Sequence, residues 1–259
     1  MKQLVILLFT GLAITAAAQL PVDRELEIGI IEKLDQTIPL DLEFYNEKSD
    51  TVTLGSLINK PTILSFVYFD CPGLCSPFLD GIADVISKMD ATLGKDYNII
   101  TISFNTTDTP EKARQKKVNF VQKIQEKDRA SWVYLTGDLG NIQKITEAVG
   151  YRYKPTGVDF VHPAALIMLS PEGKITRYLY GLTFLPFDLK MAIVEAQKGL
   201  ARPARTKLLD YCFSYDIQTK SYTLQFTRVI GAFILIVALF FGAYLLISAR
   251  RKSSKSITT

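Results

Sequence analysis

Residues 63–75 read ILSFVYFDCPGLC, and this stretch decides the fold. Its first seven residues form a continuous apolar run rich in β-prone side chains, which is typical of a strand buried on both faces of a sheet. Apolar residues at helical spacing follow from Phe78 to Leu93, so the pattern predicts a strand, a short turn and a helix. Two cysteines, Cys71 and Cys75, lie in that turn, where the helix is expected to begin.

The alternation of strand and helix continues beyond this first unit. The pattern predicts further strands at 98–104, 132–135, 164–169 and 175–180, and further helices at 110–126, 139–149 and 186–198. Such an order predicts an α/β fold with a central mixed sheet flanked by helices on both faces. Residues 19–60 are expected to add an N-terminal hairpin. The Lys and Arg residues of the second helix are expected to form its solvated face.

The N-terminus has the pattern of a secretory signal. Lys2 precedes an apolar stretch from Leu4 to Ile14, and a run of alanines at 16–18 fits a small-residue cleavage site. The alternative, a membrane-spanning anchor, is disfavoured because the apolar run is shorter than about 18 residues. We therefore expect residues 1–18 to be a signal peptide.

The C-terminus has the pattern of a membrane span. No charged residue lies between Val229 and Ala249, and a helix of this length crosses a hydrocarbon core of about 30 Å. The tail 250–259 is basic, which by the positive-inside rule indicates that it is cytoplasmic. The sequence thus predicts a single-pass cell-membrane protein. Its main domain, 19–200, is expected on the extracytoplasmic (periplasmic) side and is joined to the span 229–249 by a connector at 201–227.

Composition excludes several classes of protein. The chain has 30 Lys and Arg residues against 26 Asp and Glu, and four of the basic residues lie in the last ten positions. The rest of the chain is neutral, which argues against binding to nucleic acid, because phosphates require a basic face. Three cysteines and one histidine leave few ways to build a metal site, and a four-ligand zinc site would need all of them.

The chemistry that the sequence offers is concentrated in Cys71 and Cys75. Residues four apart on a helix share a face, and the amides at a helix N-terminus lower a thiol pKa. Two accessible thiolates could close a disulfide or hold a soft metal ion such as Cu(I). The alternative is a purely structural disulfide, which would stabilise weakly because its loop is short.

His162 is the second candidate. A lone histidine is usually an ordinary loop residue, but this one precedes the strand expected at 164–169 and could approach the first strand–helix turn. Two thiolates and one imidazole would make a trigonal site of a kind that copper accepts as Cu(I) or Cu(II).

With these motifs in place, the chain resembles the Sco/SenC family, thioredoxin-fold copper proteins of bacterial envelopes and the mitochondrial inner membrane. The resemblance runs from about Ile28 to Gly199. Its motifs are Cys71-Pro72-x-x-Cys75, Asp108-Thr109-Pro110, His162 and Pro171-x-Gly173.

This resemblance implies a thioredoxin-like fold and copper binding by Cys71, Cys75 and His162. It also implies delivery of copper, or of reducing equivalents, to the binuclear copper centre of cytochrome c oxidase or to another envelope cuproprotein. Metal transfer of this kind requires no turnover chemistry.

The chain departs from the family pattern at Ser76, Asn105 and Val161, and in having its expected anchor at the C-terminus. These departures keep open a thiol–disulfide oxidoreductase in which Cys71 and Cys75 are the redox pair. A peroxiredoxin-like peroxidase is disfavoured because no motif supplies its activating arginine. Cys212, in the connector, could be an unpaired thiol, an intermolecular disulfide or a relay ligand.

Overall fold

The structure is a computed structural model. It describes residues 28–157, 159–203, 213–216 and 221–224, together with Ile234, Val237 and Phe241. The described residues as far as Arg202 belong to one compact unit, and those from Pro203 onward belong to a second.

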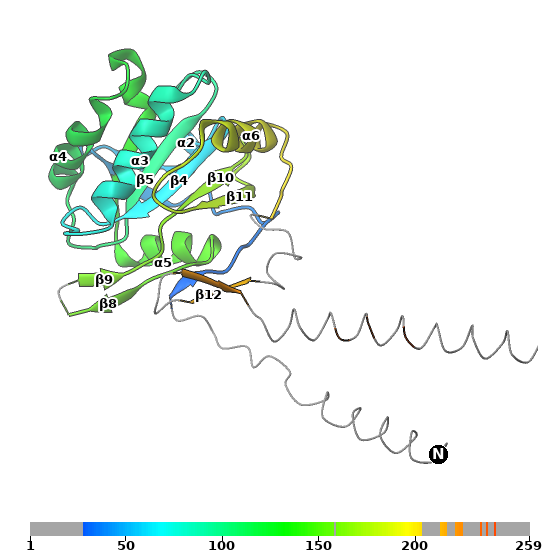
Figure 1. Ribbon diagram of the computed structural model, residues 1–259. Coiled ribbons are helices and arrows are strands. Elements are labelled where there is room, and N and C mark those ends of the chain that lie inside the picture. The colour runs from blue at the N-terminus through cyan, green and yellow to red at the C-terminus, as the bar shows by residue number, and fades with distance from the viewer. Residues whose placement is uncertain are drawn as a thin grey trace, which may run out of the picture. The chain divides into compact units, whose positions relative to one another are not determined.

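The first unit is built on a seven-stranded mixed sheet, as predicted (Figure 1). In spatial order its strands are β11 (Ile175–Tyr180), β10 (Ala165–Leu169), β4 (Thr62–Val67), β5 (Asn98–Ser103), β6 (Trp132–Thr136), β2 (Glu43–Asn46) and β3 (Thr51–Thr53). The three central strands, β4, β5 and β6, are parallel, and the outer strands pair antiparallel. The hairpin of β2 and β3 extends the sheet beyond β6.

Four main helices cover the sheet. They are α3 (Cys75–Lys88), α4 (Pro110–Val121), α5 (Leu139–Ala148) and α6 (Pro186–Gln197), and the shorter elements are α2 (Leu54–Leu57) and the 3-10 helix η2 (Glu126–Ser131). Helix α3 contacts both α4 and α6, and in Figure 1 these three lie on one side of the sheet and α5 on the other.

Local sequence explains why these elements form. All six residues of β4 are buried, as a central strand covered on both faces requires. Thr109 caps α4 by accepting a hydrogen bond from the Lys112 amide, and Pro110 fills the first turn. Asp138 caps α5 in the same way through the Asn141 amide.

Several boundaries differ from the prediction. Helix α3 begins three residues earlier than expected, at Cys75, and ends at Lys88, since Met89 takes an extended conformation. Helix α4 ends at Val121, and η2 follows separately. Two small antiparallel pairs were not predicted: β1 (Gly29–Ile30) with β7 (Tyr151–Arg152), and β8 (Lys154–Thr156) with β9 (Asp159–Val161).

The second unit contains one described strand pair, β12 (Phe213–Asp216) with β13 (Ser221–Leu224). The signal peptide predicted at 1–18 and Cys212 lie outside the described residues, as does the span predicted at 229–249 except for Ile234, Val237 and Phe241. Within the part of the chain that the structure describes, no helix combines the length and the apolar character needed to span a bilayer.

Candidate metal centre

Sheet topology brings the two cysteines and the histidine to one edge. The loop that carries Cys71 leaves the carboxyl end of β4, and Cys75 is the first residue of α3. Strand β10 runs antiparallel to β4 with Leu166 opposite Ser65, so its beginning lies beside the end of β4. His162 stands just before β10, which is how a residue 87 positions from Cys75 reaches the same place.

The three predicted ligands converge. One ligand atom each from Cys71, Cys75 and His162 lie within 4.8 Å of one another. The Cys75 Sγ is 3.5 Å from His162 Nε2, and the Cys75 amide donates to the Cys71 Sγ at 3.3 Å. Both cysteines are free thiols. Among the described residues, this is the one group of three or more His, Cys, Asp or Glu side chains arranged to hold an ion.

Aromatic side chains wall the cluster. The rings of Tyr68 and Phe104 lie 6.0 Å and 5.1 Å from the His162 ring, centroid to centroid. Cys75 is completely buried, whereas Cys71 and His162 each keep 9% of their surface exposed. The cluster is therefore largely shielded from water, and Cys71 and His162 share its small exposure.

Burial controls the protonation of these groups. It raises the pKa of the Cys75 thiol, and the neighbouring Cys71 raises it further, although the Lys116 charge acts in the opposite direction. Burial also lowers the pKa of His162. The expectation of an accessible Cys75 thiolate with a lowered pKa was wrong, because removal from water outweighs the helix N-terminus. Both groups are neutral in the metal-free protein at neutral pH.

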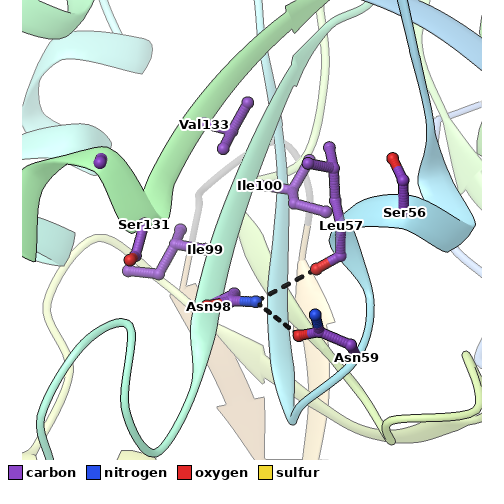
Figure 2. A pocket seen from close by; sticks show the side chains of 9 residues that line it. Ser56, Leu57, Asn59, Asn98, Ile99, Ile100, Ser131 and Val133 are labelled. Carbon is purple, nitrogen blue, oxygen red and sulfur yellow. Dashed lines mark hydrogen bonds between the residues drawn. The ribbon is translucent and has the colours of Figure 1, made fainter.

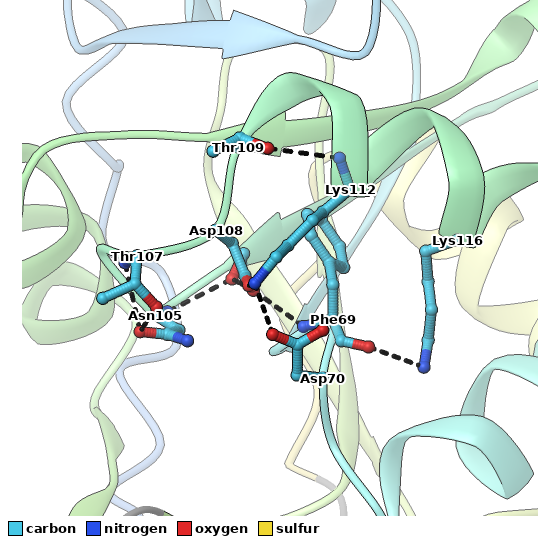
Figure 3. A network of polar contacts seen from close by, with 9 residues as sticks. Phe69, Asp70, Asn105, Thr107, Asp108, Thr109, Lys112 and Lys116 are labelled. Carbon is cyan, nitrogen blue, oxygen red and sulfur yellow. Dashed lines mark hydrogen bonds and ion pairs between the residues drawn. The ribbon is translucent and has the colours of Figure 1, made fainter.

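A buried carboxylate holds the start of the cysteine loop (Figure 3). The Asp108 Oδ2 accepts hydrogen bonds from the Phe69 amide at 2.7 Å and from the Ser103 hydroxyl at 2.6 Å. Lys112 of α4 forms ion pairs with Asp70 in the loop and with Asp108. The loop is thereby tied to the carboxyl end of β5 and to α4.

Lys116, one turn further along α4, links the two ends of the same loop, and Figure 3 shows its contact with Phe69. Its Nζ donates to the Phe69 carbonyl at 3.0 Å and to the Ser76 hydroxyl at 3.2 Å. The lysines of this helix were expected to form a solvated face, and that interpretation was wrong for Lys116 and for Lys117, whose largely buried side chain pairs with Glu47. Asp108 was noted only as part of a motif. Its position directly before the Thr109 cap is the signal that could have placed it at the strand edge.

The donor set suits a soft metal ion. Two sulfurs and one imidazole nitrogen are the ligands that Cu(I) selects, whereas Ca²⁺ and Mg²⁺ require several oxygens. An ion with bonds of about 2.0–2.3 Å to three atoms holds those atoms roughly 3.5–4 Å apart. The spread of 4.8 Å would need only a small contraction of the side chains. The residues present therefore fit a trigonal copper site.

The opposite edge of the sheet has a hollow of a different kind (Figure 2). This hollow, of about 190 Å³, lies where β5 begins and is lined by Ser56, Asn59, Asn98 and Ser131, among others. The side-chain amide of Asn98 donates hydrogen bonds to the Leu57 carbonyl oxygen at 3.1 Å and to the side-chain oxygen of Asn59 at 3.4 Å. None of the three predicted ligands lines it.

Comparison with known proteins agrees with the geometry. Residues 32–191 match the family model described as SCO1/SenC. The chain is 24% identical over 162 residues to the SCO1 protein homolog of Bacillus subtilis (strain 168), covering 61% of this chain and 81% of that protein.

Solved structures show the same fold. A crystal structure of an Aquifex aeolicus VF5 protein, provisionally described as an electron transfer protein, is 27% identical with a TM-score of 0.59. It covers 64% of this chain and 95% of the other. Arabidopsis thaliana ScoI, solved with copper bound, is 23% identical with a TM-score of 0.51, and the match covers 61% of this chain and 96% of that one. The predicted thioredoxin-like α/β fold is confirmed.

Proposed function

We propose that this chain, which belongs to the SCO1/SenC family, binds a copper ion through Cys71, Cys75 and His162 and passes it to another cuproprotein. The client we propose is the binuclear copper centre of cytochrome c oxidase. The observation that carries the proposal is the convergence of two sulfurs and one imidazole from segments far apart in the sequence.

The chain's own residues suggest how such a site would work. Binding releases the thiol protons, and the neutral Nε2 of His162, which already faces the Cys75 sulfur, needs no deprotonation. The aromatic walls exclude water and so protect the thiolates from oxidation. Cys71, which keeps 9% of its surface exposed, is followed by the exposed Pro72 and Gly73. A client would approach from that side and take the ion by ligand exchange.

The proposal includes a membrane location. It rests on the sequence, in which a signal at 1–18 and an apolar span at 229–249 would hold the α/β unit on the extracytoplasmic side.

A second candidate function is thiol–disulfide exchange. Both cysteines are free, and their sulfurs lie within 4.8 Å of each other, so a disulfide could form after small movements. In that reaction the two thiols lose two electrons and two protons, and a partner disulfide is reduced to two thiols. This chemistry does not require His162, which provides the means of separating the two functions.

The test uses the full chain, purified in detergent, reduced, incubated with Cu(I) and desalted. The wild-type protein should retain one copper per chain, and the variants Cys71→Ser and His162→Ala should retain none. Met168→Leu is the matched control, because Met168 offers a soft sulfur on the neighbouring strand β10 but is buried in the core. A wild-type chain without copper after desalting would refute the copper proposal.

Two further outcomes separate the alternatives. If His162→Ala loses copper but still reduces a small disulfide, the exchange chemistry is independent of the metal site. If deletion of the gene leaves the oxidase copper centre fully assembled, copper binding stands but the proposed client does not.

A further inference from the structure

The side of the His162 ring that faces away from the sulfurs has its own set of contacts. Nδ1 lies 3.0 Å from the carbonyl oxygen of Pro163 and 3.1 Å from the hydroxyl oxygen of Tyr151. The Tyr151 hydroxyl also lies 2.9 Å from the same Pro163 carbonyl, to which it donates. Ring nitrogen, carbonyl and hydroxyl thus form a closed triangle behind the proposed metal ligand.

This triangle favours the ring form that carries its proton on Nδ1. A carbonyl oxygen can only accept, so a hydrogen bond from the ring to Pro163 requires the proton on Nδ1. The Nε2 lone pair then points toward the Cys75 sulfur, 3.5 Å away, which is the form of the ring that binds a metal. With the proton on Nε2 instead, lone pairs of Nδ1 and of the carbonyl would face each other at 3.0 Å.

Tyr151 is held rigidly enough to fix this arrangement. It is 3% exposed, and its ring packs against Phe66 of β4 with centroids 4.7 Å apart. The preceding residue, Gly150, has φ +66°, and a Cβ there would lie 1.9 Å from the Ile31 carbonyl oxygen. The backbone that carries Tyr151 is therefore clamped against the N-terminal segment, and the hydroxyl has a defined position.

We propose that Tyr151 is a positioning residue for the metal centre, whose hydroxyl holds the Pro163 carbonyl and the His162 ring so that Nε2 faces the two sulfurs. This inference rests on the proposed copper function for its purpose. The effect of Tyr151 on the tautomer of His162 can be tested in the metal-free protein. Tyr151 carries no recognisable motif, and the topology alone places it behind the ligand.

The first experiment measures the tautomer in the metal-free full chain. His162 is the only histidine of the sequence, so nitrogen-15 labelling of histidine in a tag-free protein reports one imidazole. At about pH 8 the ring is neutral, and the wild type should show Nδ1 protonated and Nε2 bare. Tyr151→Phe keeps the packed ring and should give a mixture of both tautomers.

The second experiment measures Cu(I) affinity by competition with a chromophoric chelator. Tyr151→Phe should weaken binding about 10- to 100-fold, the usual effect of losing a partner that orients a ligand. Tyr153→Phe is the matched control: its ring also lies in the aromatic wall, 4.5 Å from Phe104, and its hydroxyl is not among the described contacts of His162. That control should bind within about twofold of the wild type.

The proposal is overturned if Tyr151→Phe leaves either the tautomer or the affinity unchanged, or if Tyr153→Phe weakens binding equally. Failure of the copper function would look different. The wild type would then bind no Cu(I) at all, while the tautomer measurement would still decide whether Tyr151 orients the ring.

Discussion

The two edges of the central sheet are made by the same three parallel strands, yet they use polar groups in opposite ways. At the carboxyl edge, thiols, an imidazole and a carboxylate are buried, and one oxygen of Asp108 has no hydrogen-bond partner. At the amino edge, the side chains of Asn98 and Asn59 contact each other around a shallow hollow. At the amino edge these side chains hydrogen-bond to one another, whereas at the carboxyl edge the ligand atoms of Cys71, Cys75 and His162 lie within 4.8 Å of one another.

The difference follows from the direction of the strands. Each parallel strand leads at its carboxyl end into a loop and the N-terminus of a helix, and ligand sites of open α/β sheets lie at that edge. The loops after β4 and β5 bring buried polar groups together there, which costs stability. In this protein the cost includes the burial of Cys75 and His162, which meet Cys71 there. The predictions below test how far the two edges differ.

The largest effect should come from Asp108→Ala. It would leave the Phe69 amide and the Ser103 hydroxyl buried without their acceptor, at about 1–3 kcal/mol each, so we expect a total loss of roughly 3 kcal/mol in the free energy of unfolding. Copper affinity should fall too, because the cysteine loop loses its attachment. Denaturant unfolding and chelator competition measure the two quantities.

Asn98→Ala is the matched change at the amino edge. Its amide bonds are partly exposed, so the loss should be about 1 kcal/mol and copper binding should not change. If the two variants lost equal unfolding free energy, or if Asn98→Ala weakened copper binding, the proposed difference between the two edges would be contradicted.

A second effect should separate two glycines that lie close together in sequence. A Cβ on Gly81 of α3 would lie 1.8 Å from the Leu182 carbonyl oxygen, whereas a Cβ on Gly73 meets nothing within 4 Å. Gly81→Ala should therefore force α3 and the 182–183 backbone apart, at a cost of roughly 2–3 kcal/mol. Gly73→Ala should be nearly neutral. Thermal unfolding of both variants measures the difference, and a neutral Gly81→Ala would show that this contact can relax.

Much of the carboxyl edge could be predicted from the sequence. The run 63–69 had to be a central strand, and a turn directly after it had to present Cys71 and Cys75 at a strand end. A histidine just before a late strand could reach the same edge only if that strand paired with β4, which the structure shows. The reasoning from topology was sound because strand direction depends on a pattern that extends over many residues.

The environment of the site could not be predicted. Cys75 is buried by the packing of segments far apart in the sequence, so the direction predicted for its pKa shift was wrong. The strand pair β8 and β9 was missed because Lys154-Pro155-Thr156 has no alternation of apolar and polar residues and contains a proline. Contacts of this kind depend on tertiary packing, so a local sequence pattern does not predict them.

A third prediction concerns pH in the metal-free protein. Burial lowers the pKa of His162, so between that value and about 6.5, its unfolded value, the unfolded chain binds more protons than the folded one. Stability contributed by the neutral ring is thus present above about pH 6.5 and is lost as pH falls through the folded pKa. Acidification should destabilise the wild type more than His162→Gln, by at most about 1.4 kcal/mol per pH unit.

The comparison with the variant is necessary because Asp108 acts in the other direction. Burial raises its pKa, so its contribution is present at low pH and is lost as pH rises through the folded value. Both proteins contain Asp108, and the difference between their denaturation profiles isolates His162. If the unfolding free energies of the two proteins changed in parallel from pH 7.5 to pH 5, protonation of the His162 ring would cost nothing. The ring would then be more accessible to water than the structure shows.

The smallest effect we predict is that of Lys116→Met on Cu(I) affinity. Two thiolates, a neutral imidazole and Cu(I) leave a net charge of −1, and the Lys116 ammonium, next to Ser76, opposes that charge. Its loss should weaken binding by about 1 kcal/mol, roughly fivefold, and the weakening should persist at high salt because the site is buried. Lys123→Met, which breaks only the exposed pair with Asp80, is the control and should have no effect. An equal affinity for Lys116→Met would show that the loop hydrogen bonds, and not the charge, are what this lysine supplies to the carboxyl edge.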